Sequence, residues 1–281
     1  MLVSRPVPAP LASWLDSLVC PRCRRALELV DRTLRCAERH SFDIARAGYV
    51  SLLTGTPATS GDDDDMARAR DSFLATGAYA PLQDAIADLA PSAARRILDI
   101  GGGTGYYLAG LLDQLPAAQG LGVDTSVRAL RFAARAHPRA AAASWDVFTR
   151  FPLRDAVADL VLDVFAPRNP EQFARVLEPG GHLLVVRPDA DHLAQLRAQV
   201  PGMVGVDPRK EERLHEALDP LFTTVRTVPV RFDLSLGAAL ARDLVAMTPS
   251  ARHVADEQLR PLLTGTREVT VSVRASLHRR R

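Results

Sequence analysis

The chain has 281 residues, 47% of them hydrophobic, which suits one large domain with a sizeable core and a small appendage. A formal net charge of +2 excludes a strongly basic global field, and no apolar stretch approaches the roughly 20 residues that span a bilayer. Three cysteines and a poor secretion signal favour a reducing cytoplasm over disulfide bonds. Lys210 is the only lysine among 35 basic residues, and the others are arginine. Such an arginine bias is typical of a GC-rich genome, and its guanidinium groups suit phosphate contacts.

Three segments precede the main body of the chain. Residues 1–17 are predicted to be a flexible lead-in, and residues 18–55 a small module that contains all the cysteines. Within the module, residues 26–36 alternate around an Asp-Arg turn, which predicts a β-hairpin. Residues 56–94 begin with a linker rich in Gly, Ser and Asp that ends at Asp65, and they continue into two helices with apolar residues on one face.

The cysteine module has the ligand spacing of a zinc site. Cys20 and Cys23 form a C-x-x-C knuckle, and Cys36 and His40 form a C-x-x-x-H knuckle after twelve intervening residues. Together they offer three thiolates and an imidazole, which can complete the tetrahedron that Zn²⁺ prefers. Four protein ligands leave no open position, so we predict a structural zinc ion.

Residues 95–281 form the last and largest unit. Short apolar strands alternate there with helices, a pattern that predicts a mainly parallel sheet covered on both faces. The basic cluster at 278–281 is predicted to be a frayed, solvated end. The predicted strands are 97–100, 120–124, 141–145, 160–164 and 181–186, with a late edge hairpin from 225–232 and 269–277.

A glycine-rich turn follows the first of these strands, and such turns let the backbone approach a ligand closely. The dinucleotide fingerprint requires a small residue at its sixth position, where this chain has the bulky Tyr106. The pattern Asp99-x-Gly101-x-Gly103-x-Gly105 instead resembles the loop of class I S-adenosylmethionine-dependent methyltransferases. That resemblance implies that the loop, with Tyr106 beside it, binds the methionine part of the cofactor and that Asp99 positions its amino group.

Polar and aromatic residues also follow the later strands. Asp124 lies 23 residues after Gly101, where a carboxylate accepts hydrogen bonds from both ribose hydroxyls; a cap for the next helix is the alternative. The same resemblance assigns Asp146 to the adenine amino group, with ordinary loop polarity as the alternative. Phe165 is either a base-stacking residue or a core aromatic.

The zinc knuckles, the glycine loop and the segments between them together resemble the RlmA family of 23S rRNA (guanine-N1)-methyltransferases, over roughly residues 18–277. The arginine-rich composition is similar to that of the RlmA(II), tylosin-resistance branch. One departure is Gly102, where the family often has cysteine; a smaller residue is compatible with cofactor binding. Further matching segments are Gly48-Tyr-Val-Ser-Leu-Leu53, Gly61-Asp62, Ala69-Arg70, Tyr79-Ala-Pro-Leu82, Ala166-Pro167, Val176-Leu-Glu-Pro-Gly-Gly181 and Met247-Thr-Pro249.

The resemblance implies a class I S-adenosylmethionine methyltransferase fold, Rossmann-like with a mainly parallel seven-stranded sheet, and a small N-terminal zinc-binding domain for RNA recognition. It implies methyl transfer to N1 of a guanine in a domain II hairpin of 23S rRNA, and macrolide resistance as a consequence. It also implies a cytoplasmic homodimer whose zinc domains flank an RNA cleft, with no membrane partner.

Two roles are left open by the residues. Because guanine N1 carries a proton that must leave, Asp163 is a candidate for orienting the base or accepting that proton; a structural role at the end of the fourth strand is the alternative. The arginines of the zinc module either contact RNA phosphates or form a solvated rim. These are Arg22, Arg24, Arg25, Arg35 and Arg39.

Two other functions compete with this one. A small-molecule S-adenosylmethionine-dependent methyltransferase would share the glycine loop, but such enzymes usually lack a zinc head. A noncatalytic zinc-containing RNA-binding protein on a methyltransferase scaffold is the second, and the complete loop from Asp99 to Gly105 followed by Asp124 argues against it.

Overall fold

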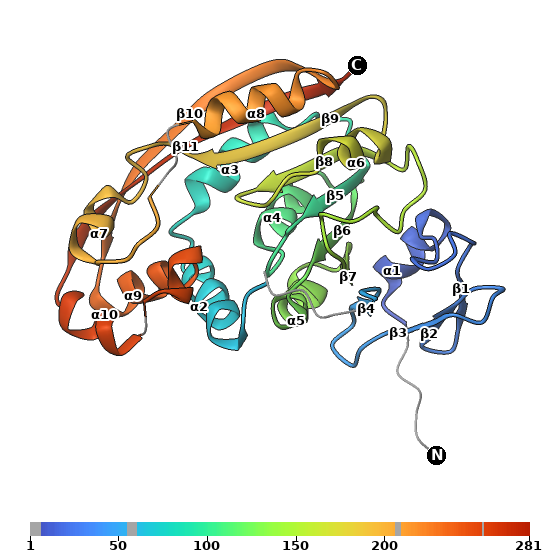
Figure 1. Ribbon diagram of the computed structural model, residues 1–281, viewed down its shortest axis with the longest axis horizontal. Helices are drawn as coiled ribbons and strands as arrows, with labels where there is room; N and C mark the ends of the chain where they lie inside the picture. Colours follow the sequence, from blue (N-terminus) through green and yellow to red (C-terminus); the bar gives the residue numbers. More distant parts are fainter. Residues whose placement is uncertain (1–6, 55–60, 206–208, 255) are drawn as a thin grey trace.

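A computed structural model describes residues 7–54, 61–205, 209–254 and 256–281. One sheet of eight strands organises it, parallel from β9 to β4 and closed at the other edge by the antiparallel strands β11 and β10 (Figure 1). The predicted mainly parallel α/β architecture and the late edge hairpin are therefore confirmed. In sheet order the strands are β10 (Phe222–Leu236), β11 (Arg267–Arg280), β9 (Leu177–Pro188), β8 (Ala158–Val164), β5 (Arg96–Ile100), β6 (Gln119–Asp124), β7 (Ala140–Ser144) and β4 (Val50–Ser51).

Helices cover both faces of the sheet because successive strand residues point to opposite sides. Leu160, Leu162 and Val164 of β8 belong to a core shared with α3 and α4, whereas Val161 belongs to a second core shared with the N-terminal module, α6 and α8. None of the described helices is both long and apolar enough to cross a bilayer. The helices of this unit are α3 (Ala80–Leu89), α4 (Tyr106–Gln114), α5 (Val127–Ala136), α6 (Pro170–Val176), α7 (Ala194–Gln199) and α8 (Lys210–Leu218).

The segment predicted to be a flexible lead-in contains a packed helix, which corrects that prediction for residues 9–17; residues 1–6 lie outside the described chain. Helix α1 (Ala9–Trp14) contacts β6 and β7, and the 3₁₀ turn η1 (Leu15–Ser17) follows it. Leu11 and Trp14 lie one turn apart, so both side chains reach the core and are fully buried. The guanidinium carbon of Arg96 lies 4.1 Å from the centre of the Trp14 ring.

The cysteine module is a three-stranded antiparallel sheet joined to the main sheet. Its strands are β1 (Glu28–Val30), β2 (Thr33–Arg35) and β3 (Ser41–Asp43), so the predicted hairpin is confirmed. The two residues of β4 then pair with β7 in parallel and add an eighth strand to the seven predicted. Figure 1 shows the module in blue beside β7. Because Cys20, Cys36 and Phe42 share a hydrophobic core with Trp145 and Val123, the module is continuous with the main unit.

The aspartate run predicted to be a linker starts a helix instead. Asp63 caps α2 (Asp64–Ala75): its Oδ1 accepts hydrogen bonds from the backbone N–H groups of Asp65 and Met66, both at 2.9 Å. Acidic residues in a first turn also interact favourably with the helix dipole, which explains why four aspartates are compatible with ordered structure here. Residues 55–60 of the predicted linker lie outside the described chain.

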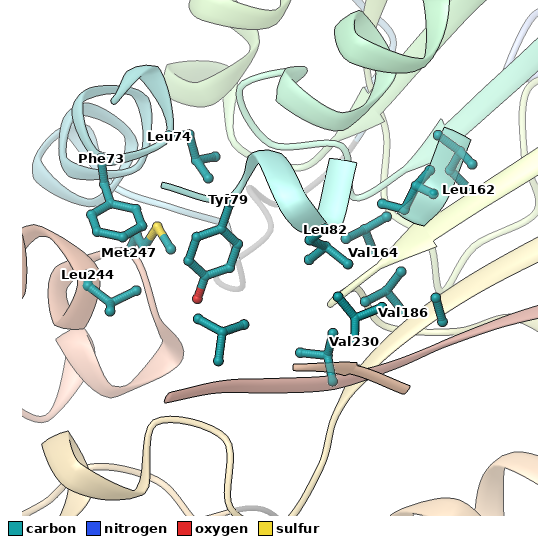
Figure 2. Packing of buried hydrophobic residues seen from close by; sticks show 14 of the residues in the cluster. Phe73, Leu74, Tyr79, Leu82, Leu162, Val164, Val186, Val230, Leu244 and Met247 are labelled. Atoms are coloured by element: carbon teal, nitrogen blue, oxygen red, sulfur yellow. The ribbon is translucent and has the colours of Figure 1, made fainter. Parts of the chain in front are cut away.

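Helix α2 packs against the C-terminal helix α9 (Ala238–Ala246). Helix α9 in turn contacts η2 (Pro249–Arg252) and α10 (Asp256–Leu262). Figure 2 shows Phe73 of α2 close to Met247 and Leu244, with Tyr79 beside them; the Phe73 and Tyr79 rings meet edge to face at 5.5 Å. This core holds the C-terminal helices beside the carboxyl ends of the parallel strands.

The basic C-terminal cluster is paired rather than frayed, which is a further correction. Strand β11 continues to Arg280, and His278 is buried. Arg280 donates to the Leu177 carbonyl, and the Arg281 N–H donates to the Leu221 carbonyl at 3.0 Å. Pairing with both β9 and β10 provides partners that the local sequence does not reveal.

Candidate functional site

The glycine loop has the backbone shape that only glycine adopts easily. Gly101, Gly103 and Gly105 have φ values of +67°, +55° and +83°. A Cβ atom at Gly101 would lie 2.6 Å from the Cβ of Ala166, so a side chain there would close the space above β5. At Gly102 a Cβ would lie 2.6 Å from Oδ2 of Asp99, so a side chain there would displace this carboxylate.

Two carboxylates lie beneath and beside this loop. Asp124, at the end of β6, accepts hydrogen bonds from the Gly103 N–H at 2.9 Å and the Ser126 N–H at 2.7 Å, and burial raises its pKa. Asp99 is 2% exposed, and burial and then the charge of Asp124 raise its pKa to about 7. Its Oδ2 has no hydrogen-bond partner within the described residues. A buried, unpaired carboxylate of this kind suits a cationic amino group on a ligand.

A cavity of about 990 Å³ opens where the parallel strands end. Ligands in open α/β sheets bind at this position, beyond the carboxyl ends of the strands. Its floor includes Gly101, Gly103 and Asp124, which were predicted from the sequence, together with Trp145 after β7 and Phe165 after β8. Helix α2 and the segment from α9 to η2 supply its opposite wall. The volume is sufficient for a nucleoside cofactor and an acceptor base together.

One ion pair of that wall was not predicted as part of the site. Arg70 Nε lies 2.7 Å from Asp62 Oδ2, and the same guanidinium donates to the Met247 carbonyl at 2.6 Å. The Ser126 hydroxyl donates to the Asp62 carbonyl at 2.6 Å. A Cβ on Gly103 would lie 3.3 Å from Arg70 Cδ, so this pair lies against the glycine loop. The signal in the sequence was the Gly61-Asp62 and Ala69-Arg70 segments, which we matched only as family motifs.

Four predicted cofactor residues lie outside the set that lines the cavity. Gly105 is the N-cap of α4, and Tyr106 packs edge to face on Tyr107, which itself lines the cavity. The Oδ1 of Asp146 accepts the Phe148 N–H at 2.9 Å. Its neighbours Trp145 and Val147 form the wall. Asp99 is also set back from the surface, under the loop.

The end of β8 carries an aromatic residue and a buried ion pair. Phe165 has φ of +57°, is 38% exposed, and stacks on the His192 ring at 6.0 Å. Asp163 is fully buried and does not line the cavity. Its Oδ1 lies 3.3 Å from Nε of Arg168, which does line it. The strained backbone at Phe165 therefore directs an aromatic ring into the cavity.

The four predicted zinc ligands converge on one point. One ligand atom from each of Cys20, Cys23, Cys36 and His40 lies within 4.8 Å of the others. The Cys23 and Cys36 sulfurs are 3.6 Å apart, and His40 Nδ1 lies 3.5 Å from the Cys20 sulfur. With Zn–S bonds of about 2.3 Å, a tetrahedron has edges of about 3.8 Å, so the donor set fits a zinc ion.

Comparison with known proteins supports both the zinc module and the methyltransferase unit. A model of the RlmA N-terminal zinc ribbon matches residues 18–57, and a methyltransferase-domain model matches residues 97–181. The 23S rRNA (guanine(748)-N(1))-methyltransferase of Streptomyces fradiae is 46% identical over 264 residues, 91% of this chain and 94% of the relative. A protein of Micromonospora griseorubida named as a candidate 23S rRNA (guanine-N(1)-)-methyltransferase is 42% identical over 94% of this chain and 98% of its own.

Among solved structures, the complex of the Haloferax volcanii Trm112 methyltransferase activator with a candidate methyltransferase matches with a TM-score of 0.50. The match covers 78% of this chain and 97% of that one at 17% identity, and it supports the methyltransferase fold alone. The buried carboxylate under the glycine loop, the acidic residue at the end of β6 and the convergent zinc ligands fit S-adenosylmethionine and a structural zinc. The chain belongs to the RlmA family of S-adenosylmethionine-dependent 23S rRNA (guanine-N1)-methyltransferases.

Proposed function

We propose that the protein methylates N1 of a single guanine in a domain II hairpin of 23S rRNA, with guanine 748, the position in the name of the S. fradiae relative, as the target. The observation that carries this proposal is one cavity that joins the glycine loop and Asp124 to the exposed Phe165 at the end of β8. A cofactor on the first side and an acceptor base on the second would meet inside it.

On the cofactor side, the residues are suited to S-adenosylmethionine, which supplies an electrophilic methyl group when bound. Asp124 is held by two backbone N–H groups in a position to accept hydrogen bonds from ribose hydroxyls. Asp99 offers a buried negative charge for the amino group, and Gly101 and Gly103 let the backbone approach. The contact from Asp146 to the adenine amino group remains a proposal, and it would use the oxygen that does not accept the Phe148 N–H.

On the acceptor side, Phe165 offers its ring to the guanine. The ring is backed by His192 and meets Tyr107 edge to face at 6.4 Å, so its position is supported from two sides. A base extruded from a hairpin loop would stack on such a ring, and stacking costs little orientation entropy when the ring is held in place.

For the rest of the RNA, the surface between the cavity and the zinc module is suitable. Phe148 is 65% exposed and follows Val147, a wall residue, and Arg150, two residues further on, is also exposed. Arg24 is not included among the RNA contacts, because its guanidinium donates hydrogen bonds to the Phe151 and Leu153 carbonyls at 2.6 and 2.9 Å. We therefore propose that RNA runs from the exposed arginines of the module across Phe148 to the cavity. Those arginines are Arg22, Arg25, Arg35 and Arg39.

The remaining properties are proposed on family resemblance: a cytoplasmic location, a homodimer whose zinc modules flank the RNA, and macrolide resistance of tylosin type. Sedimentation of the purified protein tests the dimer. Growth of a deletion strain on tylosin, with and without the restored gene, tests resistance.

The activity is tested with purified protein, tritiated S-adenosylmethionine and 23S rRNA from a strain that lacks the modification. We expect label in the RNA and a primer-extension stop at guanine 748, because N1 methylation blocks Watson–Crick pairing. Label without a stop at a guanine would exclude the N1 assignment. Calorimetric binding of S-adenosylmethionine without any transfer to RNA would favour a small-molecule acceptor, and no binding would favour the noncatalytic alternative.

A further inference from the structure

Methyl transfer to guanine N1 requires a negative charge on the base. In neutral guanine N1 carries a proton, and its removal leaves an anion shared between N1 and O6. The N1–CH₃ bond then forms while the S–CH₃ bond breaks, its electron pair stays on sulfur, and the N1 proton passes to water. A site that stabilises the anion lowers the free energy of the reactive form before transfer.

The carboxylates that line the cavity already have ion-pair or hydrogen-bond partners within the protein. Among the described lining residues these are Asp62 and Asp124. Asp62 is paired with Arg70 at 2.7 Å. Asp124 is held by the N–H groups of Gly103 and Ser126 and faces the cofactor side. Neither is placed to accept the N1 proton beside Phe165.

His192 is a donor in this arrangement. Its Nδ1 accepts the backbone N–H of Ser272 at 3.3 Å, so the neutral ring carries its proton on Nε2. The ring stacks behind Phe165 and lines the cavity. A neutral histidine protonated at Nε2 cannot take a further proton there, so it is unsuited to act as the base through that atom.

Arg168 supplies a fixed cation at the same place. It follows Phe165 by three residues, lines the cavity, and has a side chain that is 18% exposed. Its Nε lies 3.3 Å from Oδ1 of the fully buried Asp163, so a ligand in the cavity would be bound through the two terminal amino groups of the guanidinium. A guanidinium stays protonated at any working pH, and a buried carboxylate that balances its charge also restricts its orientation.

We propose that Arg168 stabilises the N1-deprotonated guanine by donating to its O6, and that Asp163 is the positioning residue that holds Arg168. This inference rests on the proposed function. It replaces the alternative in which Asp163 itself takes the proton, since Asp163 is enclosed behind Arg168 and does not line the cavity. Water is then the proton acceptor, and the protein contributes charge rather than a base.

The test measures kcat and KM for methylation of a 23S rRNA hairpin between pH 6 and 9. The variants are Arg168→Gln, Arg168→Lys and Asp163→Asn, with Arg226→Gln on the exposed part of β10 as a matched control. For Arg168→Gln we expect kcat to fall about 100-fold at pH 7 with little change in KM. Its rate should continue to rise to higher pH, with an apparent pKa about one unit above that of the wild type. Arg168→Lys should recover part of kcat, and Asp163→Asn should lie between Gln and wild type.

Several outcomes separate this proposal from its rivals. An Asp163→Asn variant that is inactive at every pH while Arg168→Gln keeps the wild-type profile would make Asp163 the base and overturn the proposal. A profile that loses its acidic limb only in His253→Ala would assign the base to that cavity histidine and also overturn it. Calorimetry with S-adenosylmethionine confirms that each variant is folded. A wild-type protein that forms no N1-methylguanine would overturn the proposed function instead.

Discussion

The burial of the Asp99 carboxyl opposes the stability of the folded chain at neutral pH. Its pKa in the folded chain is about 7, above the ordinary value of about 3.9 in an unfolded chain, so folding favours the neutral carboxyl. The stability that this carboxyl contributes is fully present below about pH 4 and is lost as the pH rises through about 7. A cationic ligand group at Asp99 would offset that loss at neutral pH.

We therefore predict opposite effects of Asp99→Asn on stability and on binding. At pH 8 the free energy of unfolding of the ligand-free protein should rise by on the order of 2–4 kcal/mol, because the buried charge is gone. At pH 4 it should change little. Affinity for S-adenosylmethionine should fall at least tenfold. Urea denaturation at both pH values and calorimetry measure these quantities; a variant less stable at pH 8 than the wild type would contradict the burial argument.

Phe148 provides a second residue-scale prediction. The turn that presents it is held by hydrogen bonds from the Phe148 N–H to Asp146 and from the Asn169 side chain to the Val147 carbonyl, so truncating the ring should leave the backbone in place. Stacking of one base on an aromatic ring contributes about 1–3 kcal/mol, so Phe148→Ala should raise KM for RNA about tenfold or more. The kcat and S-adenosylmethionine affinity should be unchanged. Val225→Ala, an exposed position on β10, is the control, and equal KM values in the two variants would remove Phe148 from the RNA path.

At the scale of elements, helix α1 is the clearest case of tertiary packing overriding local appearance. A short proline-containing segment forms a helix because Leu11 and Trp14 bury against β6 and β7. Isolated helices of this length are unstable in water, so the sheet supplies the stability.

Truncation of the Trp14 side chain tests this packing. Because the indole is fully buried and also contacts the Arg96 guanidinium, Trp14→Ala should lower the free energy of unfolding by about 3–5 kcal/mol. Equilibrium denaturation measures this change. An effect below about 0.5 kcal/mol would indicate that the N-terminal segment is the loose lead-in that its composition suggests.

At the scale of the whole molecule, the zinc module and the cofactor cavity share structure. Strand β4 pairs with β7, and the Leu52 N–H donates to the Ser144 hydroxyl at 3.0 Å. Trp145, the next residue, lines the cavity and belongs to the same hydrophobic core as Cys20 and Cys36. Loss of the metal should therefore lower cofactor affinity as well as the stability of the module.

Replacement of a zinc ligand tests this coupling. Cys23→Ser should lose the bound metal, because one of four ligands is gone, and affinity for S-adenosylmethionine should fall severalfold as the β4 edge loosens. Elemental analysis and calorimetry on the same sample measure both. Cys23→Ser with full zinc content would contradict the ligand assignment, and metal-free protein with unchanged affinity would show that the module is an independent unit.

Much of the site could be predicted from sequence because its chemistry is local. The zinc knuckles, the glycine loop and Asp124 are short patterns in which each residue type has a direct physical reason. Asp62 and Arg70 were missed as site residues because their contact with the glycine loop depends on how α2 packs against α9 and Met247. For Asp163 the sequence left a role on the base and a structural role open, and only the structure places its carboxylate, fully buried, 3.3 Å from the Arg168 guanidinium.

The amino-acid sequence by itself determined the strands, the zinc ligands and the glycine loop, because hydrophobic periodicity, ligand spacing and backbone freedom are properties of neighbouring residues. Only the tertiary structure decided that α1 is buried, that β4 completes the main sheet, and that Arg168 and Phe165 share one cavity with Asp124. These features depend on burial and charge pairing between residues far apart in the chain, and no local pattern encodes which distant partner a side chain will meet.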